Sequence, residues 1–338
     1  MLKKIKFVVC GLGAIGKRHA FIIKGTPNAQ LVGIIEPDAS KIDANPELSF
    51  CPFFHSIEDF ISSSIQADVI NICVPNGLHY SLAKIALKNG YHVVIEKPMA
   101  LKKSDCEDLI YLSLQMSKDI FIVKQNRFSP PSQLLKNIVV NEQLGKIILV
   151  QINCFWNRDD RYYMPGNWKG TKRLDGGTLF TQFSHFIDIM YWIFGDIINV
   201  NSKFSNFTHN DLTEFEDTGV VNFEFINGGL GCITFTTSTW DKNMESSITV
   251  IGENGTIKIG GQYMNEIEYC HINNFKLPEL PPTNPPNDYG PFKGSAANHH
   301  FVIDNVINTL NGHDKITANA MEGLKVVEII ERIYNSAK

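Results

Sequence analysis

The 338-residue sequence predicts an α/β domain built on a doubly wound parallel sheet, followed by an α+β domain with a large, mostly antiparallel open sheet. In the first third of the chain, short apolar runs alternate with amphipathic stretches, a pattern typical of parallel strands joined by covering helices. After about residue 126, strand-like runs follow one another through turns such as Asn227-Gly228-Gly229, which favours antiparallel hairpins. We therefore expect two domains, residues 1–125 and 126–338.

The first domain is predicted to alternate strands with helices along its whole length. Each expected strand is a nearly continuous apolar run, as a parallel strand buried on both faces requires. The expected strands are residues 4–13, 29–38, 67–76, 91–98 and 120–126, and the expected helices are residues 14–26, 56–64, 78–90 and 102–118.

The second domain is predicted to consist mainly of strands joined by turns. The expected strand regions are residues 145–156, 219–240, 245–261 and 266–272, and a Pro-rich surface arm runs from Leu277 to Tyr289. The amphipathic helix of residues 318–336 closes the chain and could pack back on the first domain.

Composition and charge favour small-molecule chemistry in the cytoplasm. A net charge of -4 without a long basic run gives no electrostatic case for nucleic acid or an anionic membrane surface. The seven cysteines are scattered without a CxxC pair, so they are interpreted as reduced core residues and not as disulfides or a zinc site. No run approaches the roughly 18 apolar residues of a membrane span, and glycines interrupt the short apolar run at the start.

The first chemical motif is Gly11-Leu12-Gly13-Ala14-Ile15-Gly16, which links the first strand to the first helix. In a dinucleotide fingerprint the first glycine allows a tight turn, the second lets the backbone approach the pyrophosphate, and the third allows helix and strand to pack closely. Glu36 ends the next strand, where a carboxylate binds the ribose hydroxyls and repels a 2′-phosphate. The sequence thus favours NAD over NADP, although Lys41 is near enough in sequence to weaken this preference.

Two adjacent charges, Glu96 and Lys97, end the strand-like run YHVVIEKP. A buried strand has no use for charges, so both are expected at its carboxyl end, where ligands of open α/β sheets bind. Pro98 would fix the turn that directs Lys97.

Four ordered motifs, GLGAIG, CVPNGLH, EKP and GGTLFTQFSHFIDIMYWIFG, resemble those of the glucose-fructose oxidoreductase/inositol dehydrogenase (Gfo/Idh/MocA) family of NAD(P)-dependent sugar dehydrogenases. The resemblance covers essentially the whole chain. It implies an N-terminal Rossmann domain that binds NAD and a C-terminal domain for substrate binding and oligomerisation.

The resemblance also implies roles for individual residues. Lys97 matches the lysine that holds the substrate and its reacting hydroxyl, and His185 matches the general base. A histidine can accept the hydroxyl proton near neutral pH while an ammonium stabilises alkoxide character. The implied cofactor contacts are Gly11, Gly13, Ala14, Ile15, Gly16, Glu36, Val74, Pro75, Asn76, His79, Glu96, Lys97, Asn126 and Trp168, and the implied substrate contacts are Lys97, Arg127, Arg158, Tyr163, Trp168, Thr181, His185 and Asn298.

One position departs from the family pattern. Many members carry an aspartate four residues before the catalytic histidine, where this sequence has Thr181. Inositol and other polyols therefore become less expected as substrates. The second domain resembles instead the branch that includes UDP-N-acetylglucosamine and UDP-N-acetylglucosaminuronate 3-dehydrogenases of bacterial surface-polysaccharide (O-antigen) biosynthesis. Five cations between residues 158 and 173 could contact a diphosphate or a uronate carboxylate: Arg158, Arg161, Lys169, Lys172 and Arg173.

Two other functions stay open at this point. One is oxidation or reduction of a free sugar or inositol, and the other is a non-catalytic NAD-binding regulator. Asn298, His299 and His300 stand before a helix and could contact substrate or simply cap the helix. We expect no metal site there, because adjacent helical positions diverge and no nearby carboxylate or cysteine completes a ligand set.

Assembly into a homodimer or homotetramer is expected through the second sheet. Phe223, Phe225, Ile233 and Phe235 alternate along its strands, and the local sequence offers few helices to cover two faces. An exposed apolar face would be buried by pairing two copies around a two-fold axis, with the Pro-rich arm able to reach a neighbour.

Overall fold

The computed structural model describes residues 3–164, 166–290 and 292–337. It divides into two compact units, residues 1–124 with 299–327 and residues 125–298 with 328–338. The division between residues 124 and 125 lies close to the domain boundary expected between residues 125 and 126. The expected second domain differs from the second unit in residues 299–317, which belong to the first unit. The placement of residues 318–327 in the first unit agrees with the expectation that the C-terminal helix packs back on the first domain.

The first unit contains a six-stranded parallel sheet of order β3-β2-β1-β4-β5-β6. Its strands are β1 (Ile5–Cys10), β2 (Ala29–Ile35), β3 (Phe53–Phe54), β4 (Val69–Ile72), β5 (His92–Ile95) and β6 (Ile120–Ile122). The central strands β1 and β4 are almost entirely buried, as their continuous apolar sequence predicts. The strand order reverses from β1 to β4, which places the carboxyl ends of these two strands at a topological switch point.

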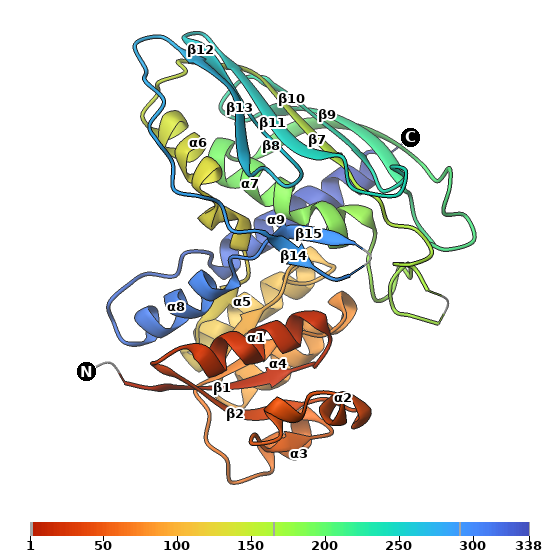
Figure 1. The fold of residues 1–338 in the computed structure, drawn as a ribbon, viewed down its shortest axis with the longest axis vertical. Coiled ribbons are helices and arrows are strands. Elements are labelled where there is room, and N and C mark those ends of the chain that lie inside the picture. The colour runs from red at the N-terminus through yellow and green to blue at the C-terminus, as the bar shows by residue number, and fades with distance from the viewer. Residues whose placement is uncertain (1–2, 165, 291, 338) are drawn as a thin grey trace. The chain divides into compact units, whose positions relative to one another are not determined.

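Helices connect the strands of this sheet. They are α1 (Ala14–Gly25), α2 (Ser40–Asp43), α3 (Ile57–Ile61), α4 (His79–Lys88), α5 (Lys103–Met116) and α8 (His299–Leu310), with short 3₁₀ turns η1 (Pro46–Leu48) and η2 (Asn76–Leu78). α8 lies beside α1 although the two are distant in sequence (Figure 1). The first half of α9 (Ala320–Asn335) also belongs to this unit, where Gly323 lies against Ile122 and Met99.

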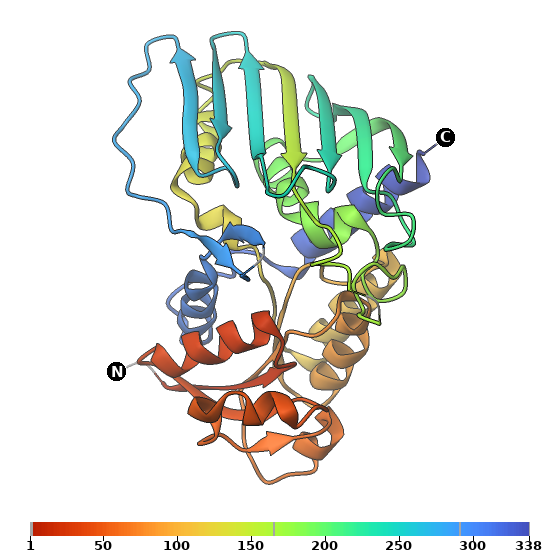
Figure 2. The same cartoon turned by 45° about the vertical axis from the view of Figure 1, so that its right-hand side comes forward.

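The second unit contains a seven-stranded sheet of order β13-β12-β11-β7-β10-β9-β8. Its strands are β7 (Ile147–Phe155), β8 (Ile197–Ser205), β9 (Thr218–Phe225), β10 (Leu230–Thr236), β11 (Glu245–Gly252), β12 (Gly255–Gly260) and β13 (Glu266–Ile272). The strands stand side by side in Figure 2, and β7 and β10 form the one parallel pair among them. The predicted fold class, a parallel sheet followed by a mostly antiparallel one, is therefore confirmed.

Helices lie on one side of the seven-stranded sheet, namely α6 (Pro130–Val140) and α7 (Ser184–Phe194), as Figures 1 and 2 show. Phe194 of α7 packs on Phe225, and Phe183 packs on Phe235. A small hairpin of β14 (Pro286–Asp288) and β15 (Lys293–Ala296) ends the Pro-rich arm.

The reason given for an exposed apolar face was wrong. Phe223, Phe225, Ile233 and Phe235 all lie on the one face that is buried within the unit. The opposite face mixes polar side chains, such as Gln151 and Glu224, with exposed apolar ones, such as Leu230, because the strands alternate inward and outward residues.

Candidate functional site

The glycine-rich turn between β1 and α1 leaves space where a dinucleotide phosphate group would lie. Gly11 has a φ of +94°, and a Cβ there would stand 2.4 Å from the carbonyl oxygen of Cys73. A Cβ on Gly16 would stand 1.8 Å from the carbonyl oxygen of Gly11. A Cβ on Gly13, by contrast, would meet nothing within 4 Å. The protein itself thus requires the first and third glycines, while Gly13 keeps open the approach to the N-terminus of α1.

Ala14 and Ile15 form the first turn of α1, directly after this opening. Gly13 is the N-cap residue, and no side chain caps the helix. The amide groups of the first turn are suited to bind an anion, so the segment fits the pyrophosphate of a dinucleotide.

Glu36 follows β2 beside the glycine turn and is buried. Its Oε2 accepts a hydrogen bond of 2.7 Å from the backbone amide of Leu12, which fixes the carboxylate against the turn. Its Oε1 forms an ion pair of 2.9 Å with Nζ of Lys41. The carboxylate is therefore placed as the fingerprint predicts, and Lys41, the residue that weakened the preference for NAD, contacts it directly.

The segment after β4 carries Val74 and Pro75, which are half-buried, and Asn76, which is buried. His79 begins α4, and its two ring nitrogens lie 2.7 Å and 2.9 Å from the carbonyl oxygens of Pro98 and Val74. Burial lowers the pKa of His79, against the effect of these two carbonyl groups. His79 therefore connects the segment after β4 to the segment after β5, and its predicted contact with the cofactor stays a prediction.

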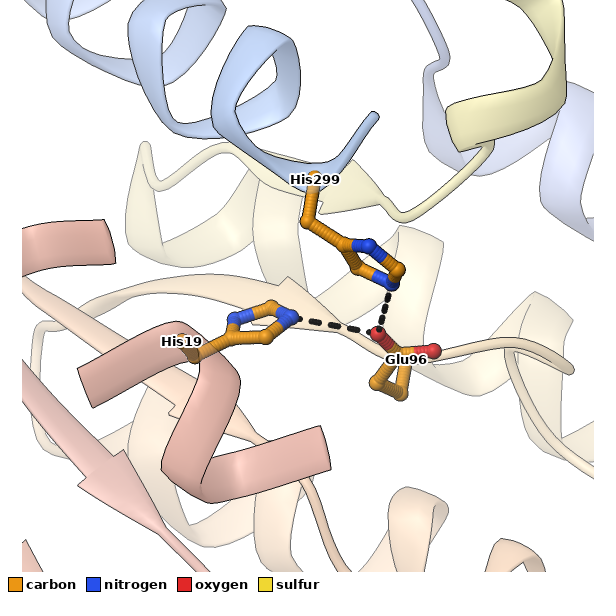
Figure 3. Close-up of side chains that lie close together, drawn as sticks. All are labelled: His19, Glu96 and His299. Atoms are coloured by element: carbon orange, nitrogen blue, oxygen red, sulfur yellow. Dashed lines mark hydrogen bonds and ion pairs between the residues drawn. The ribbon is translucent and has the colours of Figure 1, made fainter. Parts of the chain in front are cut away.

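Glu96 lies in a buried cluster with His19 and His299, which Figure 3 shows. Glu96 Oε1 is 3.1 Å from His19 Nε2 and 3.5 Å from His299 Nε2. Burial alone would raise the pKa of Glu96, but the hydrogen bonds from the two histidines hold it well below its usual range. The backbone amide of Lys97 donates to the other carboxylate oxygen, so the cluster also fixes the start of the EKP segment, which contains a cis Lys97–Pro98 peptide.

The same three side chains have the residue types of a metal site, with donor atoms within 4.8 Å of one another. Nδ2 of Asn71 donates to His19 Nδ1 at 2.9 Å, which leaves the proton of a neutral His19 on the nitrogen that faces Glu96. This arrangement favours a hydrogen-bonded cluster over a metal centre. The sequence did not indicate it, because the three residues are far apart in the chain. The expectation that no carboxylate lies near His299 was wrong.

In the second unit, α7 carries His185 as its second residue, and the side chain is buried. A π-helical turn, η4 (Leu179–Phe183), runs directly into this helix, and such turns are frequent at functional sites. Nε and Nη2 of Arg127 donate to the two carboxylate oxygens of Asp188 at 2.9 Å and 2.8 Å, and both side chains are buried. The predicted substrate residue Arg127 thus anchors α7 to the 3₁₀ turn η3 (Gln125–Phe128).

Asn126, in η3, has a buried side chain with an unusual environment. Neither its Oδ1 nor its Nδ2 has a hydrogen-bond partner among the described residues. An unpaired buried amide costs free energy and calls for an explanation, which a bound ligand would supply.

An acidic group accompanies Thr181 although the sequence position itself lacks one. Thr181 Oγ1 donates to the carboxylate of Asp175 and, at 3.0 Å, to the backbone carbonyl oxygen of the same residue. Asp175 also accepts a hydrogen bond of 2.8 Å from the amide of Gly170. The comparison of position 181 with the family pattern could not identify this carboxylate, because Asp175 lies six residues earlier in the sequence.

Three further predicted substrate residues have contacts within the second unit. Arg158 is buried and donates to the neutral acceptors of Gln182, Asn157, Asn243 and Lys293. Tyr163 is buried in an aromatic cluster with Tyr162 and Phe215. Asn298 binds Ser129 and Asn284. Trp168 is half-buried, and its contact with the cofactor stays a prediction.

Two structural features agree with the composition. None of the seven cysteines, all of which the structure describes, forms a disulfide, and five of them are buried. Within the described residues, no helix has the length and apolar character needed to cross a lipid bilayer.

Comparisons with known proteins identify the family to which this chain belongs. Residues 5–123 match the model "Oxidoreductase family, NAD-binding Rossmann fold", and residues 132–258 match "GFO/IDH/MocA C-terminal domain". The WlbA dehydrogenase from Bordetella pertussis, solved with NADH and UDP-GlcNAcA, is 31% identical over 99% of this chain and 96% of its own, with a TM-score of 0.87.

A second WlbA dehydrogenase, from Chromobacterium violaceum and with the same two ligands, is 30% identical over 99% of this chain and 94% of its own, with a TM-score of 0.88. Among curated proteins, the glucose-6-phosphate 3-dehydrogenase of Bacillus subtilis is 22% identical over 98% of this chain and 96% of its own. The glycine turn, Glu36 and these matches agree on NAD as the cofactor. The chain belongs to the Gfo/Idh/MocA family of NAD-binding oxidoreductases.

Proposed function

We propose that the protein oxidises the C3 hydroxyl of a UDP-N-acetylhexosamine, or of its uronate, to the 3-keto sugar. The observation that carries this proposal is the full-length similarity to two WlbA dehydrogenases whose structures contain NADH and UDP-GlcNAcA. Two curated relatives, named glucose-6-phosphate 3-dehydrogenase and D-glucoside 3-dehydrogenase, support the choice of C3. The proposed setting is the cytoplasmic synthesis of sugars for a bacterial surface polysaccharide such as an O-antigen.

Two residues of the chain carry out the proton chemistry in this proposal. His185 accepts the proton of the C3 hydroxyl, since an imidazole is basic enough near neutral pH to serve as a general base. The ammonium group of Lys97 donates to the same oxygen and stabilises the negative charge that develops on it. When bound, NAD accepts the hydride from C3, which leaves the carbonyl group of the product.

The positions of both residues are supported by their neighbours. Glu96, held by His19 and His299, accepts a hydrogen bond of 3.1 Å from the amide of Lys97, and this fixes the backbone that bears the ammonium group. The buried pair of Arg127 and Asp188 fixes α7 one turn after His185. Fixed positions of this kind lower the cost of reaching the transition state.

NAD binding in this proposal uses the residues that the family resemblance assigns to the cofactor. The glycine turn and the N-terminus of α1 would hold the pyrophosphate, and Glu36 would bind the adenosine ribose. The buried amide of Asn126 would gain the hydrogen-bond partner that it lacks within the described residues. The backbone around Val74, Pro75 and Asn76 contacts the second ribose.

A turnover panel tests the proposal. Purified protein with NAD is mixed separately with UDP-GlcNAc, UDP-GlcNAcA, glucose and inositol, and NADH formation is followed by absorbance. We expect NADH only with the nucleotide sugars. Turnover of glucose or inositol alone would support the alternative of a free-sugar dehydrogenase, which the relative named D-glucoside 3-dehydrogenase favours. NAD binding without any turnover would identify a non-catalytic regulator.

A further inference from the structure

The segment of residues 158–173 contributes five cationic side chains to the second unit, and these side chains differ in the groups that they contact. Arg161 forms ion pairs with Asp159 and Asp241. Lys172 and Arg173 are exposed. Arg158 uses its guanidinium to bind neutral acceptors within the protein. Only Lys169 combines partial burial with an ammonium group that no carboxylate of the described residues approaches within ion-pair distance.

Lys169 lies over aromatic rings. Its Nζ is 3.8 Å from the ring centroid of Tyr162 and 5.2 Å from that of Phe292. The guanidinium carbon of Arg158 lies 5.2 Å from the centroids of the same two rings. Two cations therefore share one aromatic pair, and the ring faces supply the attraction that keeps them there.

Among the described residues, no carboxylate lies within ion-pair distance of either cation. Burial first, and then the charge of Arg158, lower the pKa of Lys169 to about 8, while the charge of Asp175 raises it more weakly. A half-buried ammonium beside a buried guanidinium is costly, since neither charge is paired directly with a carboxylate of the described residues. An oxyanion bound at Nζ would remove this cost and would satisfy the ammonium donors.

We propose that Lys169 binds an oxyanion of the nucleotide-sugar substrate, which is either the diphosphate or the C6 carboxylate. This inference rests on the proposed function, because that function defines the two oxyanions. Arg158 does not contact the anion directly in this proposal. It stays bound to its protein acceptors and adds its positive charge beside the Tyr162 ring.

The test compares Lys169→Met with Lys146→Met, which removes the same charge from an exposed residue of the same unit. The two substrates are UDP-GlcNAc and UDP-GlcNAcA. We expect Lys169→Met to raise KM about 10- to 100-fold, the effect of losing a hydrogen bond to a charged group, with kcat nearly unchanged. Lys146→Met should leave KM within twofold of the parent.

The two substrates identify the anion. A rise in KM for both assigns Lys169 to the diphosphate, whereas a rise for UDP-GlcNAcA alone assigns it to the carboxylate. The pH dependence gives a second readout. Because only the ammonium form binds an anion, kcat/KM of the parent should fall as the pH rises through about 8, and Lys169→Arg should keep its value at higher pH.

A purely structural lysine would give a different result. Its replacement would lower the melting temperature and leave KM within twofold for both substrates, and this outcome would overturn the inference while the proposed function stands. If the parent protein neither binds nor oxidises either nucleotide sugar, the proposed function fails and the inference fails with it.

Discussion

Glu36 is the residue to which we assign the preference for NAD over NADP. Its carboxylate is fixed by the amide of Leu12 and paired with Lys41, so that both groups stand where the adenosine ribose is expected. The carboxylate favours the two hydroxyls of NAD. Lys41, the partner of Glu36 in this ion pair, could instead attract the 2′-phosphate of NADP.

We predict that Glu36→Ala weakens NAD binding about 10- to 100-fold, because hydrogen bonds to a charged group are lost. NADP should bind at least as well as before, since Lys41 is released from its ion pair. The double change of Glu36 and Lys41 to alanine should remove any gain in NADP affinity. Titration calorimetry of the parent and of both variants with NAD and with NADP measures these affinities, and equal binding of NAD and NADP by the parent protein would contradict the role of Glu36.

His185 is the residue on which the proposed proton transfer depends. We predict that His185→Asn lowers turnover about 100- to 10,000-fold, the usual contribution of a general base. NAD affinity should stay within twofold of the parent value, because the residues assigned above to the pyrophosphate and the riboses of NAD do not include His185. His271→Asn, which changes an exposed histidine of β13, is the control. Activity of His185→Asn within a few-fold of the parent would show that another group takes the proton.

At the residue scale, the sequence correctly predicted where the glycine turn and Glu36 lie, while the cofactor contacts of these residues stay predictions. The three glycines and Glu36 were predictable because a turn between a strand and a helix admits few residues. The Glu96 cluster and the contact of Asp175 with Thr181 were not, because they depend on which distant segments meet in the fold. The protein partners of Arg127 and Arg158 could not be predicted for the same reason, and the contact of either residue with substrate stays a prediction.

At the scale of elements, hydrogen bonds among Tyr334, Glu216 and Thr178 fix the π-helical turn that leads into α7. Tyr334, near the end of α9, accepts a hydrogen bond of 3.1 Å from the amide of Leu179 and donates one of 2.6 Å to Glu216. Thr178 Oγ1 donates to the carbonyl oxygen of Glu216 at 2.6 Å. A Cβ on Gly177 would stand 2.4 Å from the Tyr334 hydroxyl, so this glycine is required for the close approach.

The buried carboxyl group of Glu216 predicts that the stability of the protein depends on pH. Burial raises the pKa of Glu216 to about 7. The folded state therefore retains a proton that the unfolded state loses, and the free energy of unfolding should decline as the pH rises from about 4.5 to about 7. Glu216→Gln, which keeps an acceptor for Tyr334, should remove this decline, whereas Glu214→Gln at a neighbouring exposed carboxylate should not. Urea unfolding across this pH range measures both, and identical slopes for parent and Glu216→Gln would contradict the prediction.

The elements themselves were predicted unevenly. Long apolar strands and amphipathic helices, such as β1 and α4, were clear because burial imposes their period. The two-residue strand β3, the helix α6 and the π-helical turn η4 were not expected. A π turn differs from an α turn by one inserted residue, which leaves the apolar pattern almost unchanged.

At the scale of the whole molecule, the seven-stranded sheet still has one face that no helix among the described residues of its unit covers (Figure 2). This face is mixed in character, because exposed apolar residues such as Leu230 and Tyr269 stand among polar ones. The apolar-patch argument for assembly was wrong, but the family resemblance and the flat uncovered sheet still favour pairing of two copies.

We predict a homodimer or homotetramer joined through this face. Light scattering at micromolar concentration should give at least twice the single-chain mass of 38.0 kDa. Gln151→Arg, at an exposed position of the central strand β7, should dissociate the assembly, since it brings like charges together across a two-fold axis. Ser40→Arg, on the exposed helix α2, should not. A parent protein with the mass of one chain would contradict the prediction.

The most direct test of the central claim follows the hydrogen atom on C3. UDP-GlcNAc and UDP-GlcNAcA carrying deuterium at C3 are each incubated with the protein and NAD, and the reduced cofactor and the sugar are analysed by mass spectrometry. The account predicts deuterated NADH together with a 3-keto nucleotide sugar that has lost its label. Unlabelled NADH with deuterium retained on the sugar, or no NADH from either substrate, would contradict oxidation at C3.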